Sequence, residues 1–111
     1  MIWTFPARLV RVIDGDTVVL DLDLGFYQWR LGRSYRLARI DAPELNTELG
    51  KVARAAVDAF LVGESLLVKS LLAQTSKADN FGRFIVELLA DGENVSDWLV
   101  ANGHAIYRTF S

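Results

Sequence analysis

The 111-residue sequence contains no cysteine and a single histidine. Without cysteine there is neither a disulfide framework nor a thiol nucleophile, so the sequence leaves the redox compartment open. Protein zinc sites are built largely from cysteine and histidine, so a zinc centre is not expected. A bound metal would have to be held by oxygen ligands, which favours calcium, magnesium or manganese.

The sequence also lacks any apolar run near the ~20 residues that span a bilayer, so no membrane partner is expected. Its first six residues, MIWTFP, carry neither the basic nor the apolar region of a signal peptide. We therefore expect a cytoplasmic protein, or a mature chain whose leader has been removed. The length and the hydrophobic fraction of 51% are typical of one globular domain over residues 1–111, which we expect to be monomeric.

No strong excess of charge is present, because the net charge is −2. This argues against a coat protein that binds nucleic acid non-specifically, but it permits an enzyme that grips a few phosphates locally. The cations are unevenly placed: nine of the twelve are arginine. Four of these arginines fall within ten residues, at Arg30, Arg33, Arg36 and Arg39.

The hydrophobic pattern predicts a β-meander followed by a helix. Two partly alternating runs, residues 7–13 and 17–24, flank the Asp-Gly pair of a hairpin. Residues 25–32 are expected to form a loop from which a third strand returns to Ile40. An alanine-rich segment over residues 51–62 then predicts a helix, with Thr47 as a possible N-cap and Gly63 beyond its end.

The second half predicts two more strands and a second helix. The expected strands cover residues 66–72 and a run ending at Leu89, and the expected helix covers residues 95–102. A short final strand is expected near residues 105–107. Five strands with a helix between the third and fourth give a mainly β (α+β) chain with the order of an oligonucleotide/oligosaccharide-binding (OB) barrel.

The segment YRLARIDAPE, residues 35–44, combines acidic and basic side chains at the end of a strand. Pro43 offers no backbone N–H and keeps Ala42 extended, so the strand must stop there. The turn therefore presents the carboxylates of Asp41 and Glu44 beside a strand that carries Arg36. Two acids and a planar cation on one rigid element are suited to binding a metal ion and a phosphate together.

Each motif also has a plain structural interpretation. In this interpretation, the turn Asp14-Gly15-Asp16 simply supplies positive φ values. Arg36 then simply forms a salt bridge to the turn that follows it. The segment DNFGR, residues 79–83, can be a surface turn. The first turn and the end of the third strand lie at the same edge of a meander, so Asp16 and Asp41 are expected to be neighbours.

Taken together, the motifs resemble the staphylococcal nuclease-like (thermonuclease) family. The resemblance rests on VIDGDTVVL at 12–20, YRLARIDAPE at 35–44, NFGR at 80–83, and a tail of DG, helix and NGHA at 91–105. It covers nearly the whole chain in the right order, although the hairpin between Asp16 and Arg36 looks longer than in the family. It implies an OB barrel that hydrolyses phosphodiesters of DNA or RNA with calcium, with single-stranded substrates preferred.

The resemblance also implies roles for individual residues. Asp16, Asp41 and the carbonyl of Ala42 would bind calcium, and Asp14 would contact these ligands rather than the calcium itself. Glu44 would position or deprotonate the attacking water. The scissile phosphate and the charge of its five-coordinate transition state would be bound by Arg36 and Arg83. Fixed cations at that point lower the barrier, because the diester gains negative charge as hydroxide adds.

Further residues suggest nucleic-acid contacts. In the expected hairpin loop, rings and cations are interleaved at Phe26, Tyr27, Trp29, Arg30 and Arg33, which suits base stacking beside a phosphate-binding groove. The alternative is that the rings pack on the barrel and the arginines are solvated. Tyr107 lies near the position of family tyrosines that flank the substrate, although a tyrosine at the rim of the core is an equally simple interpretation.

The sequence thus predicts a calcium-dependent nuclease. One alternative is a catalytically silent OB module that binds nucleic acid or a protein partner, and another is a phosphodiesterase that uses manganese or magnesium. Silent modules usually lack part of the catalytic set, whereas here Asp16, Arg36, Asp41, Glu44 and Arg83 are all present. Arg39 has no assigned role and is expected to face solvent, with a further phosphate contact as the alternative.

Overall fold

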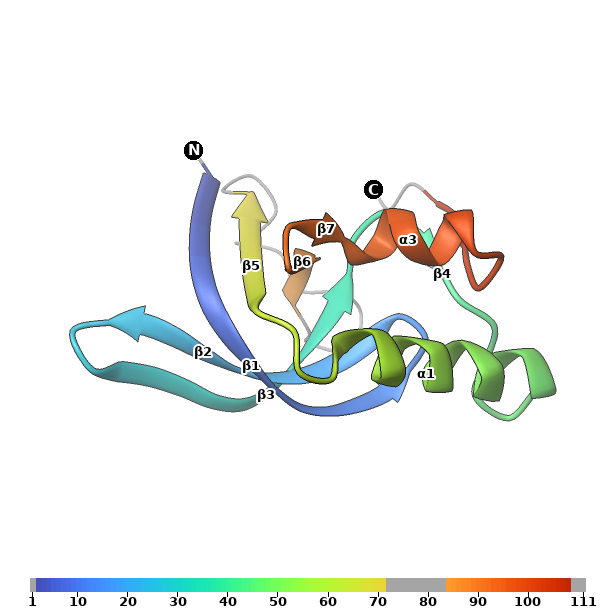
Figure 1. Cartoon of the computed structure of the whole chain (residues 1–111), viewed down its shortest axis with the longest axis horizontal. Helices are drawn as coiled ribbons and strands as arrows, with labels where there is room; N and C mark the ends of the chain where they lie inside the picture. Colours follow the sequence, from blue (N-terminus) through green and yellow to red (C-terminus); the bar gives the residue numbers. More distant parts are fainter. Residues whose placement is uncertain (1, 72–83, 109–111) are drawn as a thin grey trace.

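The computed structural model describes residues 2–71 and 84–108, and its centre is a barrel of five long strands (Figure 1). They are β1 (Ile2–Asp14), β2 (Thr17–Gly25), β3 (Gln28–Leu37), β5 (Leu66–Leu71) and β6 (Phe84–Ala90). The first three form the predicted antiparallel meander, and β1 pairs on its other side with β5.

A parallel pairing closes the barrel. Strand β5 pairs antiparallel with β6, and β6 then lies parallel to the end of β3, from Tyr35 opposite Phe84 to Leu37 opposite Val86. The result is a five-stranded mixed barrel with the strand order of an OB fold, which confirms the predicted fold class. Closure matters for function, because it brings the end of β3 against both β2 and β6.

Three two-residue strands complete the described sheets. Strand β7 (Glu93–Asn94) extends the edge at β6, and β4 (Ile40–Asp41) pairs antiparallel with β8 (Ile106–Tyr107). The β4–β8 pair is a separate small sheet at the end of the barrel. It joins the segment that carries Asp41 to a segment more than sixty residues later in the chain.

Two helices are present in the described residues, α1 (Glu48–Leu61) and α3 (Val95–Ala101). Thr47 is the N-cap of α1, as predicted, because its side chain accepts a hydrogen bond from the Gly50 amide at 3.0 Å. Asn94 caps α3 in the same way. No helix in residues 2–71 and 84–108 is long and apolar enough to cross a bilayer.

The barrel interior and the inner faces of both helices form one apolar core. Helix α1 contributes every third or fourth residue to it, which is the spacing that places side chains on one helical face. The largest completely buried apolar side chains are Val18, Leu20, Tyr35, Leu37, Ile40, Val57, Leu61, Val68, Leu88, Val95 and Leu99.

The prediction of a loop over residues 25–32 is wrong. Strand β2 continues to Gly25 and β3 begins at Gln28, so only Phe26 and Tyr27 form the turn. Both have positive φ values, 54° and 62°, as a two-residue type I′ hairpin requires. The paired strands project beyond the barrel as an arm (Figure 1). A ring-rich sequence without Asn-Gly gave no signal for so tight a turn.

Candidate metal and phosphate site

Asp16, Arg36 and Asp41 come together at the end of the barrel where β2, β3 and β4 meet. The guanidinium of Arg36 lies between the two acids, with Nη1 2.9 Å from Asp16 Oδ2 and Nη2 3.5 Å from Asp41 Oδ1. The Arg36 side chain is only 9% exposed. The predicted proximity of these three residues is therefore confirmed, and one buried cation links the two carboxylates.

Gly15 allows the first turn to approach this site, but not through a positive φ value. The φ of Gly15 is outside the left-handed region. The interpretation that this turn supplies positive φ values is therefore wrong. A Cβ at Gly15 would instead lie 2.8 Å from Ala42 Cβ and 2.9 Å from Ala53 Cβ. Gly15 thus lets the turn pack between the end of β4 and helix α1, which places Asp16 beside Ala42.

The carboxylate of Asp16 is held from several sides. Oδ2 accepts a hydrogen bond from the Ala42 amide at 3.0 Å, and Oδ1 accepts one from the Thr17 hydroxyl at 3.2 Å. Burial and a side-chain hydrogen bond with Asp14 raise the pKa of Asp16 to about 6, and they outweigh the opposite effects of the Ala42 amide and Arg36. Negative charge is therefore incompletely neutralised at this point.

Asp14 supports the turn from the end of β1. Its Oδ1 accepts a hydrogen bond from the Asp16 amide at 3.1 Å, which is the local pattern of an aspartate turn. The two side chains also contact each other. Asp14 therefore lies next to Asp16 and helps to fix its backbone.

Glu44 follows Asp41 by three residues and has an exposed side chain. Its backbone is fixed, because the Glu44 carbonyl accepts hydrogen bonds from the Thr47 amide at 3.0 Å and the Thr47 hydroxyl at 2.7 Å. A Cβ at Gly50 would lie only 1.8 Å from the same carbonyl. The first turn of α1 thus holds the segment that presents Glu44 to solvent.

Arg108 is a site residue that the sequence analysis missed. Its Nη1 lies 2.9 Å from Asp41 Oδ2, so Asp41 is contacted by Arg36 on one oxygen and by Arg108 on the other. Arg108 follows β8 and is 67 residues from Asp41. A tyrosine-arginine pair near the end of the chain gives no local signal for this contact, which depends on the β4–β8 pairing.

The residues suggested for nucleic-acid contact lie elsewhere. Trp29 is on the arm, where the guanidinium carbon of Arg8 lies 4.8 Å from the centre of its ring. Arg30 lies over the rings of Tyr35 and Phe84, at 5.4 and 5.0 Å. Arg33 is exposed on β3. These residues do not join the carboxylates, so the site and the arm are distinct parts of the surface.

Two further predictions need comment. Tyr107 is exposed on β8 and donates a hydrogen bond to Asp97 rather than lying in the core. Arg39 is exposed, as expected, with 43% of its side chain accessible, and it also forms ion pairs with Glu87 and Asp97 that the sequence did not indicate. Arg83 and the rest of the NFGR segment lie outside the described residues.

The chemistry of the donor set fits a hard cation. Asp16 and Asp41 offer carboxylate oxygens and Ala42 offers a carbonyl, and calcium and magnesium prefer such all-oxygen ligands. The raised pKa of Asp16 shows that its buried surroundings do not fully stabilise its negative charge. Within residues 2–71 and 84–108, no group of three or more acidic or histidine side chains is arranged around one metal position. A metal here would rest on two carboxylates, a carbonyl and solvent.

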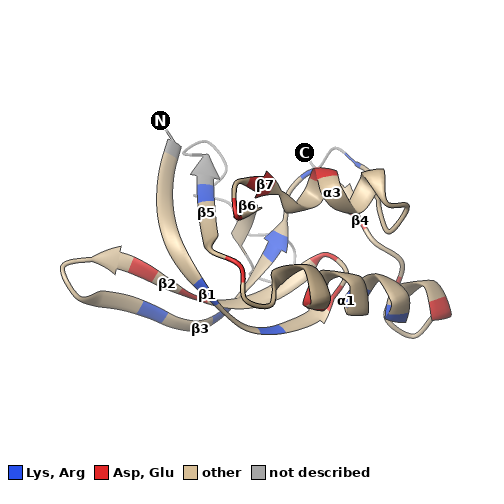
Figure 2. Cartoon of the chain, viewed as in Figure 1, with Lys and Arg blue, Asp and Glu red and all other residues tan. Residues whose placement is uncertain are grey.

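Charge is not gathered into a broad basic face. Basic and acidic positions are interspersed over most of the described ribbon, although β3 carries basic positions only (Figure 2). Long-range attraction of a polyanion is therefore weak, and phosphate binding depends on individual arginines such as Arg36.

A family model described as "Staphylococcal nuclease homologue" matches residues 34–111. An "Uncharacterized endonuclease" of Escherichia coli O157:H7 is 31% identical over 108 residues, covering 95% of this chain and 63% of its own length. The "Succinoglycan biosynthesis protein ExoI" of Rhizobium meliloti is 30% identical over 108 residues, covering 87% of this chain and 49% of its own.

A plant protein is also similar. The "Probable staphylococcal-like nuclease CAN2" of Oryza sativa subsp. japonica is 31% identical over 77 residues, which cover 68% of this chain and 20% of the plant protein. The chain thus spans less than two thirds of the length of each of these relatives.

Proposed function

Since the chain belongs to the staphylococcal nuclease family, we propose that it is a calcium-dependent nuclease that hydrolyses phosphodiester bonds of DNA or RNA. The observation that carries this proposal is the contact of one buried arginine, Arg36, with both Asp16 and Asp41. Two carboxylates that can bind a cation therefore lie beside a rigid guanidinium that can bind a phosphate.

Each residue has a role that its surroundings support. Asp16 and Asp41, with the Ala42 carbonyl, would hold calcium, which when bound polarises the phosphate and the attacking water. Arg36 is positioned to bind the phosphate oxygens, because burial restricts its planar fork to one orientation. Glu44 is exposed on a fixed backbone, so its carboxylate can reach a water molecule and accept its proton.

Arg83 completes the proposed set as a second cation for the transition state. Its place in the proposal rests on the NFGR motif of the sequence. Two guanidinium groups on opposite sides of a phosphate spread the charge that develops as hydroxide adds. The substrate proposed is single-stranded nucleic acid, with the rings of the β2–β3 arm as a secondary contact.

The alternative from another functional class is an OB module that binds nucleic acid or a protein without cleaving it. The geometry favours the enzyme, because a pure binding module gains nothing from two carboxylates placed beside its phosphate-binding arginine. Arg36 lies between those acids, and a metal ion that took over the two carboxylates would release its guanidinium for a phosphate. A phosphodiesterase that uses manganese or magnesium would be built on the same ligands.

Replacing Glu44 by glutamine tests the mechanism. We expect Glu44→Gln to cut single-stranded DNA in calcium at least about 100-fold more slowly than wild type, because glutamine cannot accept the proton of the water. The matched control is Glu48→Gln, the same change at an exposed glutamate one turn along. Equal cleavage by wild type and Glu44→Gln would refute the proposed role.

A further inference from the structure

Arg39 occupies a strained position between the two halves of the site. It lies between β3, which carries Arg36, and β4, which carries Asp41, and its φ is +67°. A left-handed backbone costs a residue with a side chain roughly 1 kcal/mol or more relative to glycine. Such a conformation persists only where the surroundings hold it in place.

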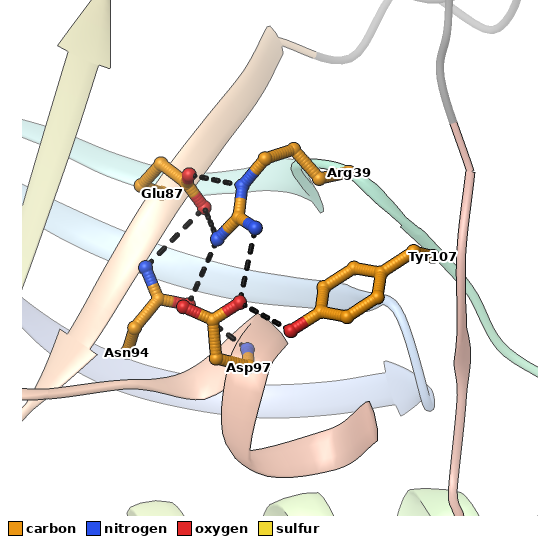
Figure 3. Close-up of polar contacts among 5 residues, drawn as sticks. All are labelled: Arg39, Glu87, Asn94, Asp97 and Tyr107. Carbon is orange, nitrogen blue, oxygen red and sulfur yellow. Dashed lines mark hydrogen bonds and ion pairs between the residues drawn. The ribbon is translucent and has the colours of Figure 1, made fainter. Parts of the chain in front are cut away.

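The side chain of Arg39 is held by two strands and a helix (Figure 3). Its Nε and Nη2 contact the two carboxylate oxygens of Glu87 on β6, at 2.6 and 3.2 Å. Its Nη1 contacts Asp97 Oδ1 on α3 at 3.0 Å, and Nη2 also reaches Asn94 Oδ1 at 3.4 Å. A two-point fork of this kind fixes orientation as well as distance.

Tyr107 joins the same cluster from β8. Its hydroxyl donates to Asp97 Oδ1 at 2.8 Å, and the guanidinium carbon of Arg39 lies 5.8 Å from the centre of its ring. Hydrogen bonds from Arg39 and Tyr107 lower the pKa of Asp97, which is ionised at neutral pH. Figure 3 shows the five side chains converging, with Arg39 at their centre.

The backbone carries this anchoring to Asp41. The Arg39 carbonyl accepts a hydrogen bond from the Arg108 amide at 2.7 Å, and Asp41 pairs with Ile106 across the β4–β8 ladder. Arg108 then contacts the Asp41 carboxylate at 2.9 Å. An unbroken chain of contacts thus runs from the barrel wall, through Arg39 and β8, to an acid of the proposed metal site.

We propose that Arg39 is a positioning residue, which ties β4 and β8 to the barrel and thereby holds Asp41 opposite Asp16 and Arg36. This proposal rests on the proposed nuclease function for its catalytic consequence, but its structural part can be measured without any activity. Misplacing a catalytic group by about 1 Å can cost on the order of 100-fold in rate, so a residue outside the site can control it.

Three variants separate the backbone of Arg39 from its side chain. Arg39→Gly removes the guanidinium but accepts the positive φ, whereas Arg39→Ala removes the guanidinium and keeps the strain. Arg39→Lys keeps the charge but cannot make the two-point fork. The matched control is Arg8→Ala, since Arg8 also pairs with a carboxylate, with both Nε and Nη2 on Oδ2 of Asp21 in β2.

Amide hydrogen exchange in the metal-free protein is the first measurement. The Arg108 amide reports the bond to Arg39, and the Ala42 amide reports the bond to Asp16 across the site. We expect both amides to exchange at least about tenfold faster in Arg39→Gly and Arg39→Ala, through local opening of β4 and β8. Arg39→Lys should be intermediate, and Arg8→Ala should leave both amides unchanged.

Steady-state cleavage of single-stranded DNA in calcium is the second measurement. We expect Arg39→Gly to lower kcat by about tenfold with KM changed less than about threefold, and Arg39→Lys to recover part of the loss. Unchanged exchange at Ala42 and Arg108, or faster exchange with an unchanged kcat, would overturn the positioning role. If the wild type does not cleave at all, the proposed function fails, and the two amides still decide whether Arg39 holds β4.

Discussion

Asp16 must satisfy two opposing requirements. A carboxylate that binds a cation has to be ionised, but this one is 8% exposed and lies beside Asp14. The buried Arg36 and the Ala42 amide stabilise its charge only in part, and its pKa rises to about 6. Without a metal ion, the folded protein therefore buries an Asp16 carboxylate whose charge is not fully stabilised. Such perturbed groups are common at functional sites.

This raised pKa predicts a pH dependence of stability in the metal-free protein. The folded state binds the Asp16 proton more tightly than the unfolded chain does. Protonation of Asp16 therefore stabilises the folded state fully below the ordinary pKa of 3.8, and this stabilisation is lost as pH rises through about 6. The loss is at most about 3 kcal/mol, from a shift of roughly two units. Asp16→Asn should lack it.

Urea unfolding in chelator at several pH values between 4 and 6 measures this effect. The informative quantity is the difference in unfolding free energy between wild type and Asp16→Asn, because acids that do not contact Asp16 titrate equally in both proteins. This difference includes any change at Asp14, whose side chain contacts Asp16. Asp97, whose pKa is lowered, gives the opposite slope at lower pH. A difference that stays constant from pH 4 to pH 6 would contradict the account of Asp16.

At the scale of residues, the sequence was informative where the chemistry is local. Asp41, Pro43 and Glu44 form one short motif. The expectation of a third strand that runs on to Ile40 is wrong, because β3 ends at Leu37 and a turn separates it from β4. Arg39 and Arg108 could not be predicted, because their partners lie 48 to 67 residues away along the chain. Nor does a sequence show that Arg39 has a positive φ, since arginine is not a residue that favours it.

Helix α1 illustrates how an element supports a site that it does not contain. Its first turn passes so close to the Glu44 carbonyl that position 50 has no room for a side chain. In most helices a change from glycine to alanine is stabilising by up to about 1 kcal/mol. Here the sign is reversed, because the backbone of the segment that presents Glu44 would have to move.

We expect Gly50→Ala to lower the unfolding free energy by about 2 kcal/mol, as overpacking does, and to slow cleavage by displacing Glu44. Gly63→Ala is the matched control at the other end of α1, where φ is +78° but the space is open. It should cost about 1 kcal/mol through backbone strain and leave the rate unchanged. Thermal unfolding and cleavage rates of both variants check this. A Gly50→Ala enzyme as active as wild type would be inconsistent with the packing.

The β2–β3 arm presents rings without covering them. Phe26 and Tyr27 are 97% and 100% exposed at its tip, whereas Trp29 has Arg8 against its ring. Exposed aromatic side chains beside arginines suit the stacking of unpaired bases. Of the three rings that the sequence suggested, the two at the tip are therefore better candidates for a nucleic-acid contact than Trp29.

Replacing the tip by Asn-Gly, as Phe26→Asn with Tyr27→Gly, removes both rings and keeps the type I′ turn. In a Glu44→Gln background with calcium, we expect the affinity for single-stranded DNA to fall about tenfold, because each stacked base contributes roughly 1–3 kcal/mol. The control, Phe26→Tyr with Tyr27→Phe, keeps two rings and should bind like the parent. Fluorescence anisotropy measures both. An unchanged affinity of the ring-free variant would exclude the arm from binding.

At this scale the sequence predicted strands and helices well and one connection poorly. The helix α1 was recognisable from its cap at Thr47 and from the glycine after its end. The tight turn at Phe26 and Tyr27 was not, because both residues are unusual at positive φ. Such a conformation is imposed by the pairing of the flanking strands rather than by the turn residues themselves.

For the whole molecule, closure of the barrel is what assembles the site. The meander brings Asp16 to the end of β3, the parallel pairing with β6 buries Arg36, and β8 reaches back to β4. The order of strands and helix predicted this architecture, because few topologies accommodate five strands with one helix after the third. The distances within the site could not be predicted, since they depend on how the barrel closes.

The most direct test of the central claim is the metal dependence of cleavage by the wild-type protein. We predict that it cuts single-stranded DNA in calcium, that chelator abolishes cleavage, and that restoring calcium recovers the rate, because a metal ion on Asp16 and Asp41 would polarise the phosphate and the attacking water. Cleavage that persists unchanged in chelator, or no cleavage with calcium, magnesium or manganese, would contradict a metal-dependent nuclease at this site.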